Sequence, residues 1–89
     1  MKSVSIKISG KVQGVFFRKS TQEKAIELGI AGFVQNMPDG SVYAEAEGDD
    51  DAIEQFVQWC KEGPLLASVA SVEVGTLKHS GFEKFIILK

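Results

Sequence analysis

The residues best suited to chemistry in this chain lie in the segment 10–18, which reads GKVQGVFFR. Gly10 and Gly14 permit positive φ and close approach of the backbone, so several N–H groups can point at one centre. A helix that begins at Phe17 would add the free N–H groups of its first turn. Arg18 would then lie at the positive end of the helix dipole, where a cation is disfavoured by roughly 0.3–1 kcal/mol. An anion in the loop would reverse that repulsion, so the segment predicts an oxyanion site, most naturally for phosphate.

Two segments of the chain carry a family resemblance. Residues 10–18 resemble the first signature of the acylphosphatase family, and residues 32–36 (GFVQN), followed by DGSV at 39–42, resemble the second. The segments lie at the spacing that the family shows, and the resemblance extends over essentially the whole chain. The family often has Trp at the position of Phe33 and Lys or Arg at that of Gln35. Neither difference falls on a proposed catalytic position, although Gln35 removes a positive charge near the site.

The resemblance implies a fold, an activity and site residues. The implied fold is ferredoxin-like, and the implied activity is hydrolysis of acyl phosphates, the mixed anhydrides of a carboxylic acid and phosphate. Arg18 matches the arginine that binds the phosphate, and Asn36 matches the asparagine that orients the attacking water. The backbone amides of the phosphate-binding loop belong to Val12, Gln13, Gly14, Val15 and Phe16.

The residue types in the two segments favour an acyl phosphate over a phosphate ester. They contain no histidine, cysteine or free carboxylate to serve as acid, base or nucleophile, since the turn pairing of Asp39 with Gly40 accounts for Asp39. An alkoxide leaving group would need a proton or a metal ion. A leaving carboxylate resembles Asp or Glu, with a pKa of about 4, and departs without a proton near neutral pH. We therefore expect catalysis by positioning and electrostatic stabilisation, with no metal and no cofactor.

Length and composition limit the other possibilities. The 89 residues make a single domain, 1–89. A net charge of −2 argues against nucleic-acid binding. The single cysteine excludes an internal disulfide, and together with the single histidine it excludes the usual zinc-ligand spacings. We find no signal peptide and no apolar run of the roughly 20 residues needed to span a bilayer, so we expect no membrane contact. We expect a cytoplasmic monomer whose partners are an acyl phosphate substrate and the product inorganic phosphate.

Apolar periodicity predicts the elements that position the site. The predicted strands are residues 3–9, 30–36, 41–47, 71–77 and 82–88, with residues 65–70 as an apolar connection. The predicted helices are residues 17–28 and a second helix that runs from an N-cap in the acidic run 49–51 to residue 62. This order predicts an α+β, ferredoxin-like βαββαβ sandwich. Its antiparallel sheet has four main strands plus a short extra one, with two helices on one face.

Alternation within the strands predicts which side chains face the core. Val34 and Asn36 share one face of their strand, so Asn36 at the strand's end can reach the site. In the following strand, the face with Tyr43, Glu45 and Glu47 is expected to be solvated.

Side chains near and beyond the two segments are expected to have structural roles. Phe16 and Phe17 are expected to be wall and core rather than ligand contacts. Cys60 is expected to pack on the apolar face of the second helix, with Trp59 at its flank. His79 lies in a polar turn and is expected to be solvated.

Other functions remain open at this point. The chain could be a non-catalytic ferredoxin-like module that binds an anion or RNA, or a stand-alone relative of acylphosphatase-like domains in larger enzymes. RNA-binding versions of the fold expose aromatics on central strands. The strand aromatics here, Phe33, Tyr43 and Phe85, form no such motif. Phosphate affinity without turnover would indicate the binding module, and retention on RNA at moderate salt would indicate the RNA function.

Overall fold

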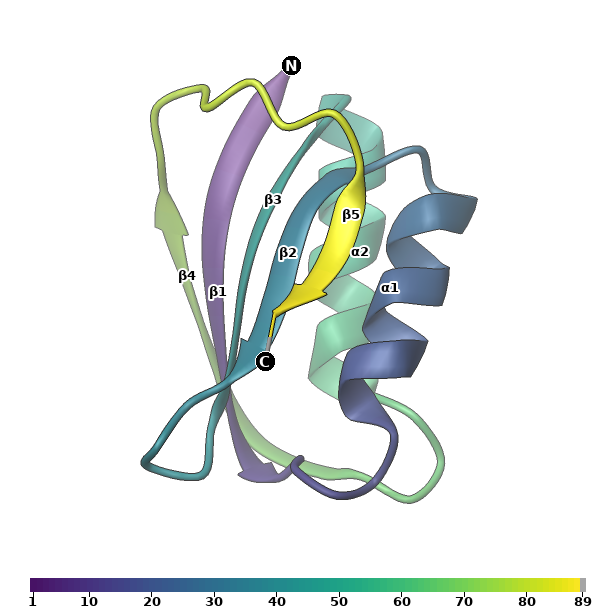
Figure 1. Cartoon of the computed structure of the whole chain (residues 1–89), viewed down its shortest axis with the longest axis vertical. Coiled ribbons are helices and arrows are strands. Elements are labelled where there is room, and N and C mark those ends of the chain that lie inside the picture. Colours follow the sequence, from purple (N-terminus) through teal and green to yellow (C-terminus); the bar gives the residue numbers. More distant parts are fainter. Residues whose placement is uncertain (89) are drawn as a thin grey trace.

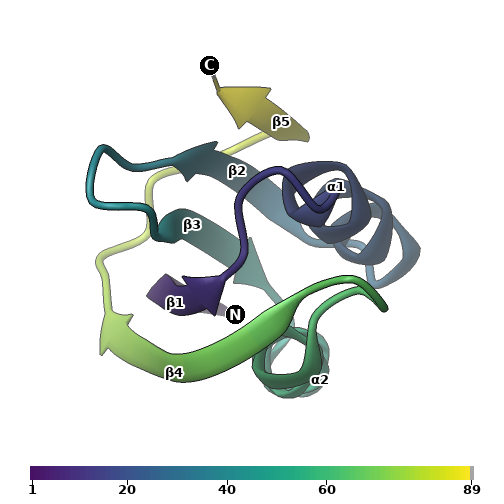
Figure 2. The same cartoon turned by 90° about the horizontal axis from the view of Figure 1, so that it is seen from below.

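Five strands and two helices build the molecule, which a computed structural model describes over residues 1–88. The elements are β1 (Lys2–Lys11), α1 (Phe17–Glu27), β2 (Ala31–Asn36), β3 (Val42–Gly48), α2 (Asp50–Glu62), β4 (Ser68–Thr76) and β5 (Phe85–Leu88). The strands form one sheet in the order β4-β1-β3-β2-β5. Both helices cover the same face of this sheet (Figures 1 and 2). The expected βαββαβ ferredoxin-like fold is confirmed, while the last residue of the predicted domain lies outside the described residues.

The sheet is antiparallel except at one edge. β1 pairs antiparallel with β3 and β4, and β2 pairs antiparallel with β3. β5 instead runs parallel to β2, from Phe85 opposite Gly32 to Leu88 opposite Gln35. The prediction of a wholly antiparallel sheet is therefore wrong at this edge. The connection from β4 crosses the top of the sheet in Figure 1, so β5 starts at the same end as β2 and runs beside it in the same direction.

The two C-terminal strands have different bounds from those predicted. β4 begins at Ser68 rather than at residue 71, because Ser68 and Val69 pair with the end of β1 beyond a register shift between Ser9 and Gly10. The prediction that residues 68–70 belong to an apolar connection is therefore wrong. β5 begins at Phe85 rather than at residue 82. The preceding backbone has another partner, because the N–H groups of residues 80–82 donate to a carboxylate.

That carboxylate belongs to Glu47, which is buried on β3 with 4% of its surface exposed. The prediction of a solvated position is wrong here, because Glu47 accepts hydrogen bonds from the Ser3 hydroxyl (2.9 Å) and from the N–H groups of residues 80–82. Burial raises the pKa of Glu47, but these hydrogen bonds together hold it below its usual value. The exposed His79 places its Nδ1 3.5 Å from the same carboxylate.

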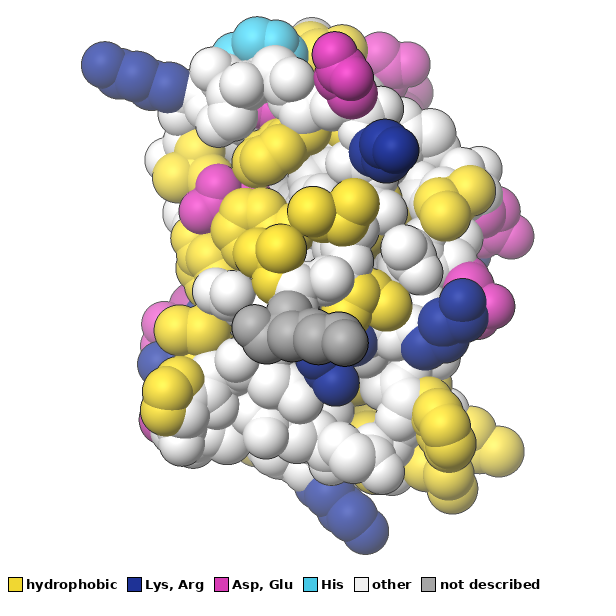
Figure 3. Space-filling view, in the orientation of Figure 1, with side chains coloured by type: hydrophobic (Ala, Val, Ile, Leu, Met, Phe, Trp, Pro, Cys, Tyr) yellow, Lys and Arg dark blue, Asp and Glu magenta, His cyan; other side chains and the backbone are white. Residues whose placement is uncertain are grey.

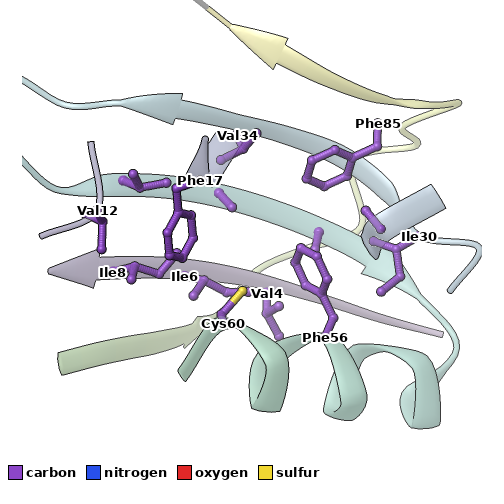
Figure 4. Packing of buried hydrophobic residues seen from close by; sticks show 14 of the residues in the cluster. Val4, Ile6, Ile8, Val12, Phe17, Ile30, Val34, Phe56, Cys60 and Phe85 are labelled. Carbon is purple, nitrogen blue, oxygen red and sulfur yellow. The ribbon is translucent and has the colours of Figure 1, made fainter. Parts of the chain in front are cut away.

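The hydrophobic core lies between the sheet and the helices (Figure 4). α1 buries Phe17, Thr21 and Ala25, one turn apart, as its periodicity predicts. The residues that α2 buries are Ile53, Phe56 and Cys60. Burial raises the pKa of the Cys60 thiol to about 12, which fits its predicted packing role.

No helix within residues 1–88 is long and apolar enough to span a bilayer.

The ends of the helices follow local sequence signals in part. Gly29, with φ of 71°, follows the C-cap of α1: its N–H donates to the Ile26 carbonyl, and the Ile30 N–H donates to the Ala25 carbonyl. Asp49 stands at the N-cap of α2, but its side chain makes no capping hydrogen bond. The expected side-chain cap is therefore absent there, and the acidic first turn of α2 contributes through the helix dipole.

Candidate active site

The loop between β1 and α1 presents unpaired backbone amides. It crosses from the end of β1 to the start of α1 (Figure 2). Gly14 has a φ of 74° and Phe16 a φ of 61°, so both are left-handed. Within residues 1–88, the N–H groups of residues 13–16 donate to no backbone or side-chain acceptor. Left-handed residues alternating with ordinary ones form a concavity of N–H groups that suits an anion.

The first turn of α1 continues this concavity. The first hydrogen bond of the helix runs from the Ser20 N–H to the Phe16 carbonyl, at 3.0 Å. The N–H groups of residues 17–19 therefore have no partner within the helix. The first turn of α1 also holds no acidic residue that could neutralise the positive end of its dipole.

A pocket of about 290 Å³ lies beside the loop. Its lining residues are Val12, Gly14, Phe16, Phe17, Arg18, Lys19, Asn36 and Ile87. It thus brings together both predicted catalytic side chains and part of the predicted phosphate loop. Two of the predicted loop residues do not line it, because Val15 turns its side chain into the core and Gln13 turns its side chain toward the β2–β3 hairpin.

Three lining residues were not among the predicted site residues. Lys19 directly follows Arg18, so its position in the motif could have revealed it. Phe17 forms a wall from the core side, with its ring 5.8 Å from that of Trp59. Ile87 comes from β5, and no local signal could have placed it here, because its position depends on the parallel pairing of β5 with β2.

Arg18 is held at the pocket by contact with β5. Its Nη1 donates to the Leu88 carbonyl at 3.3 Å. One turn further along α1, Gln22 donates to the Phe85 carbonyl at 3.1 Å. These two contacts fix the start of α1 against β5, and the orientation of Arg18, which sequence reasoning left open, follows from them.

Asn36 enters the pocket from the end of β2. It pairs with Val42 and shares its face with Val34, which is fully buried, so the predicted alternation is confirmed. Gln13 connects this strand end to the loop: its Nε2 donates to the Met37 carbonyl at 2.8 Å and to the Ser41 carbonyl at 2.9 Å. One side chain therefore joins the two segments that carry the predicted site residues.

Asp39 belongs to the hairpin and not to the pocket lining. Its Oδ1 accepts hydrogen bonds from the Ser41 hydroxyl (2.6 Å) and N–H (2.9 Å), and its Oδ2 lies 3.1 Å from Lys7 Nζ. The hydrogen bonds from Ser41, followed by that from Lys7, lower the pKa of Asp39 to about 2. The carboxylate is therefore committed to the turn, as its pairing with Gly40 suggested.

The two positions that differ from the family's common residues also lie outside the pocket lining. The ring of Phe33 lies 6.0 Å from that of Tyr43 and 5.9 Å from that of Phe82. Gln35 donates to the sulfur of Met37, at 3.5 Å. Figure 3 shows apolar side chains gathered over β5 and the strands beside it. Phe33 thus takes part in packing between strands rather than in lining the pocket.

The chemistry of the pocket follows from its lining. Its charged side chains, Arg18 and Lys19, are both cations, and none of the described residues that line it is a carboxylate, imidazole or thiol. The amide of Asn36 can accept a hydrogen bond from water and donate one to an oxyanion at the same time. The arrangement can therefore bind an anion and hold a neutral nucleophile beside it. Among residues 1–88, no group of three or more His, Cys, Asp or Glu residues is placed to hold a metal ion.

Comparison with known proteins gives consistent similarities. A family model described as acylphosphatase matches residues 4–87. An acylphosphatase of Rubrobacter xylanophilus is 51% identical over 80 residues, which cover 90% of this chain and 73% of the relative. One of Methylococcus capsulatus is 42% identical over 90 residues, covering 100% of this chain and 98% of the relative. The crystal structure of acylphosphatase from Bacillus subtilis superimposes with a TM-score of 0.96 at 34% identity, over 100% of both chains.

Proposed function

The chain belongs to the acylphosphatase family, and from this premise we propose that Arg18 and the loop amides hold the phosphoryl group while Asn36 orients the water that attacks it. The reaction is hydrolysis of an acyl phosphate to a carboxylate and inorganic phosphate. The observation that carries the assignment is the shared pocket, which Arg18, Asn36 and the loop line from three parts of the chain.

The phosphoryl group binds first in this scheme. The free N–H groups of residues 13–16 and of the first turn of α1 donate to its oxygens. The planar guanidinium of Arg18 donates two parallel hydrogen bonds to two of these oxygens. The positive end of the α1 dipole also stabilises the bound anion. Bound phosphate lowers the repulsion between Arg18 and the helix N-terminus, so the anion and the cation stabilise each other.

The attack then depends on position. A water held by the Asn36 amide forms the new P–O bond as the bond between phosphorus and the acyl oxygen breaks. The electron pair of that bond leaves with the carboxylate, and the proton of the water passes to an oxygen of the phosphate formed or to solvent. Charge that builds on the phosphoryl oxygens faces donors already in place, so little reorganisation is required.

The leaving group explains why the pocket can work without an acid. A carboxylate with a pKa of about 4 is stable as an anion near neutral pH and needs no proton to depart. The described lining residues supply no metal-ligating carboxylate, imidazole or thiol, which supports a metal-free route. A phosphate ester, with an alkoxide leaving group, would be a poor substrate for this site.

Hydrolysis of benzoyl phosphate in the presence of a chelator tests the proposal. Arg18→Ala is expected to lower turnover by about 10³-fold or more, because transition-state charge loses its cation. Asn36→Ala is expected to lower kcat while inhibition by inorganic phosphate stays largely intact, because the amide acts on the water. Two exposed residues of α2 provide matched controls, Lys61→Ala and Gln58→Ala, and both should retain wild-type turnover.

Three outcomes would contradict the scheme. Loss of activity with the chelator would make the route metal-dependent. Wild-type kcat in Asn36→Ala would remove its assigned role. Phosphate binding with no turnover by the wild-type protein would leave an anion-binding module.

A further inference from the structure

The side chain of Phe16 has a role that neither the fold nor phosphate binding explains. It lines the pocket beside Arg18 and Asn36, yet 75% of its surface is exposed. Its backbone is left-handed, with φ of 61° and ψ of 24° at the N-cap of α1. A bulky residue is uncommon in this conformation, which glycine adopts without steric cost. Glycine would preserve the amide geometry of the loop, so the phenyl ring needs a reason of its own.

The exposed ring does not stabilise the fold by packing. The adjacent Phe17 is 2% exposed and belongs to the core, whereas Phe16 faces the pocket and solvent. Strained residues persist mainly where a functional site requires them. An apolar side chain that is exposed, strained and placed at the rim of an anion site is suited to contact the uncharged part of an anionic ligand.

We infer that Phe16, together with Ile87 of the same pocket, forms the binding surface for the acyl group and favours apolar, especially aromatic, acyl phosphates. The inference rests on the proposed function and adds a substrate class to it. The apolar walls of the pocket are Val12, Phe16, Phe17 and Ile87. Val12 and Phe17 are packed in the core, so Phe16 and the half-buried Ile87 are the walls whose side chains remain accessible to an acyl group.

The test compares two substrates that share a phosphate and differ in the acyl group. In Phe16→Ala, kcat/KM for benzoyl phosphate is expected to fall about 10-fold more than kcat/KM for acetyl phosphate, because a methyl group offers the ring little contact area. Phe16→Leu keeps an apolar side chain and should recover part of the preference. Both variants retain a Cβ, so the backbone strain at this position is the same as in the wild type.

Binding without turnover gives a second readout. Benzoylphosphonate, in which a C–P bond replaces the hydrolysable linkage, should lose about 10-fold more inhibitory strength in Phe16→Ala, relative to the wild type, than inorganic phosphate does. Leu65, 98% exposed in the connection after α2, provides the matched control, and Leu65→Ala should leave both substrates unaffected.

The outcomes separate this inference from the proposed function. Equal losses for benzoyl and acetyl phosphate in Phe16→Ala would overturn the acyl-binding role and leave the hydrolytic function standing. Unchanged kinetics for both substrates would also overturn it. A preference of the wild type for an acyl phosphate with a second carboxylate would indicate that Lys19 selects the acyl group instead of Phe16. Absence of turnover with every acyl phosphate would overturn the proposed function and this inference together.

Discussion

Replacing Gln13 by Met should impair the positioning of the attacking water while leaving phosphate binding largely intact. Gln13→Met keeps the length of the side chain but removes the two hydrogen bonds to the Met37 and Ser41 carbonyls. In the wild type these bonds connect the loop between β1 and α1 to the hairpin that follows Asn36. We therefore expect Gln13 to act as a positioning residue that sets the distance between the bound phosphoryl group and the water on Asn36.

The size of the effect on stability follows from these contacts. Each hydrogen bond contributes about 0.5–1.5 kcal/mol net, so the pair contributes about 1–3 kcal/mol. Both carbonyls keep another donor, since the Gly40 N–H donates to Met37 and the Met37 N–H donates to Ser41. The loss should therefore lie near the lower end, about 1–2 kcal/mol. For a domain of this size that lowers Tm by about 5–15 °C.

The effect on catalysis should exceed the effect on binding. A displacement of about 1 Å between reacting groups costs up to about 10²-fold in rate, so kcat should fall at least about 10-fold. Inhibition by inorganic phosphate should change less than about 2-fold, because the loop amides and Arg18 remain. In an Asn36→Ala background, Gln13→Met should lower kcat no further, because its target is already absent.

Thermal unfolding by circular dichroism and steady-state kinetics on benzoyl phosphate check these expectations, with the exposed Gln58→Met as the control. A lower Tm with unchanged kcat would show that Gln13 has only a structural role. An equal loss of kcat in the wild-type and Asn36→Ala backgrounds would refute the proposed connection between Gln13 and Asn36.

Two further predictions concern stability. Because the pKa of Glu47 lies below its usual value of 4.5, its ionised carboxylate stabilises the fold above that pH and the contribution is lost as the pH falls below it. The Tm of Glu47→Gln should accordingly lie below that of the wild type at pH 7, and the difference in Tm should shrink below about pH 4.5. A difference in Tm that is independent of pH would contradict a stabilising role of the ionised Glu47 carboxylate. Gly32→Ala would place a Cβ 1.9 Å from the Glu45 carbonyl oxygen, whereas Gly81→Ala, also at positive φ, meets no atom within 4 Å. Chemical denaturation should show Gly32→Ala less stable than Gly81→Ala by about 1–3 kcal/mol, and equal stabilities would argue against the close approach of β2 and β3 at this position.

Part of the candidate site could be read from local sequence. The glycine pattern and the apolar stripe of α1 predicted the loop and the helix start at Phe17, and alternation in β2 predicted the face of Asn36. These features depend on residues within a few positions of each other, where φ preferences and periodicity act directly. The catalytic roles of Arg18 and Asn36 came from the family resemblance and remain predictions, and both residues line one pocket.

Local sequence was a weaker guide where a side chain meets a distant segment. Glu47 follows the alternation of a solvated strand face, and nothing around it indicates that the backbone of residues 80–82 will cover it. Gln13 was predicted only as a source of a backbone amide, although its side chain connects to the hairpin. Both side chains have partners more than twenty residues away, so the choice of partner depends on how the sheet assembles.

By itself, then, the sequence determined the order of the elements, the glycine-containing loop after β1 and the face that carries Asn36, because short-range backbone preferences and side-chain periodicity decide these. Only the tertiary structure decided that β5 pairs parallel with β2, that Ile87 completes the pocket and that Leu88 holds Arg18. A strand of four residues carries too little local pattern to specify its direction or its neighbour. Those depend on the path of the chain over the end of the sheet and on hydrogen bonds between residues far apart in sequence.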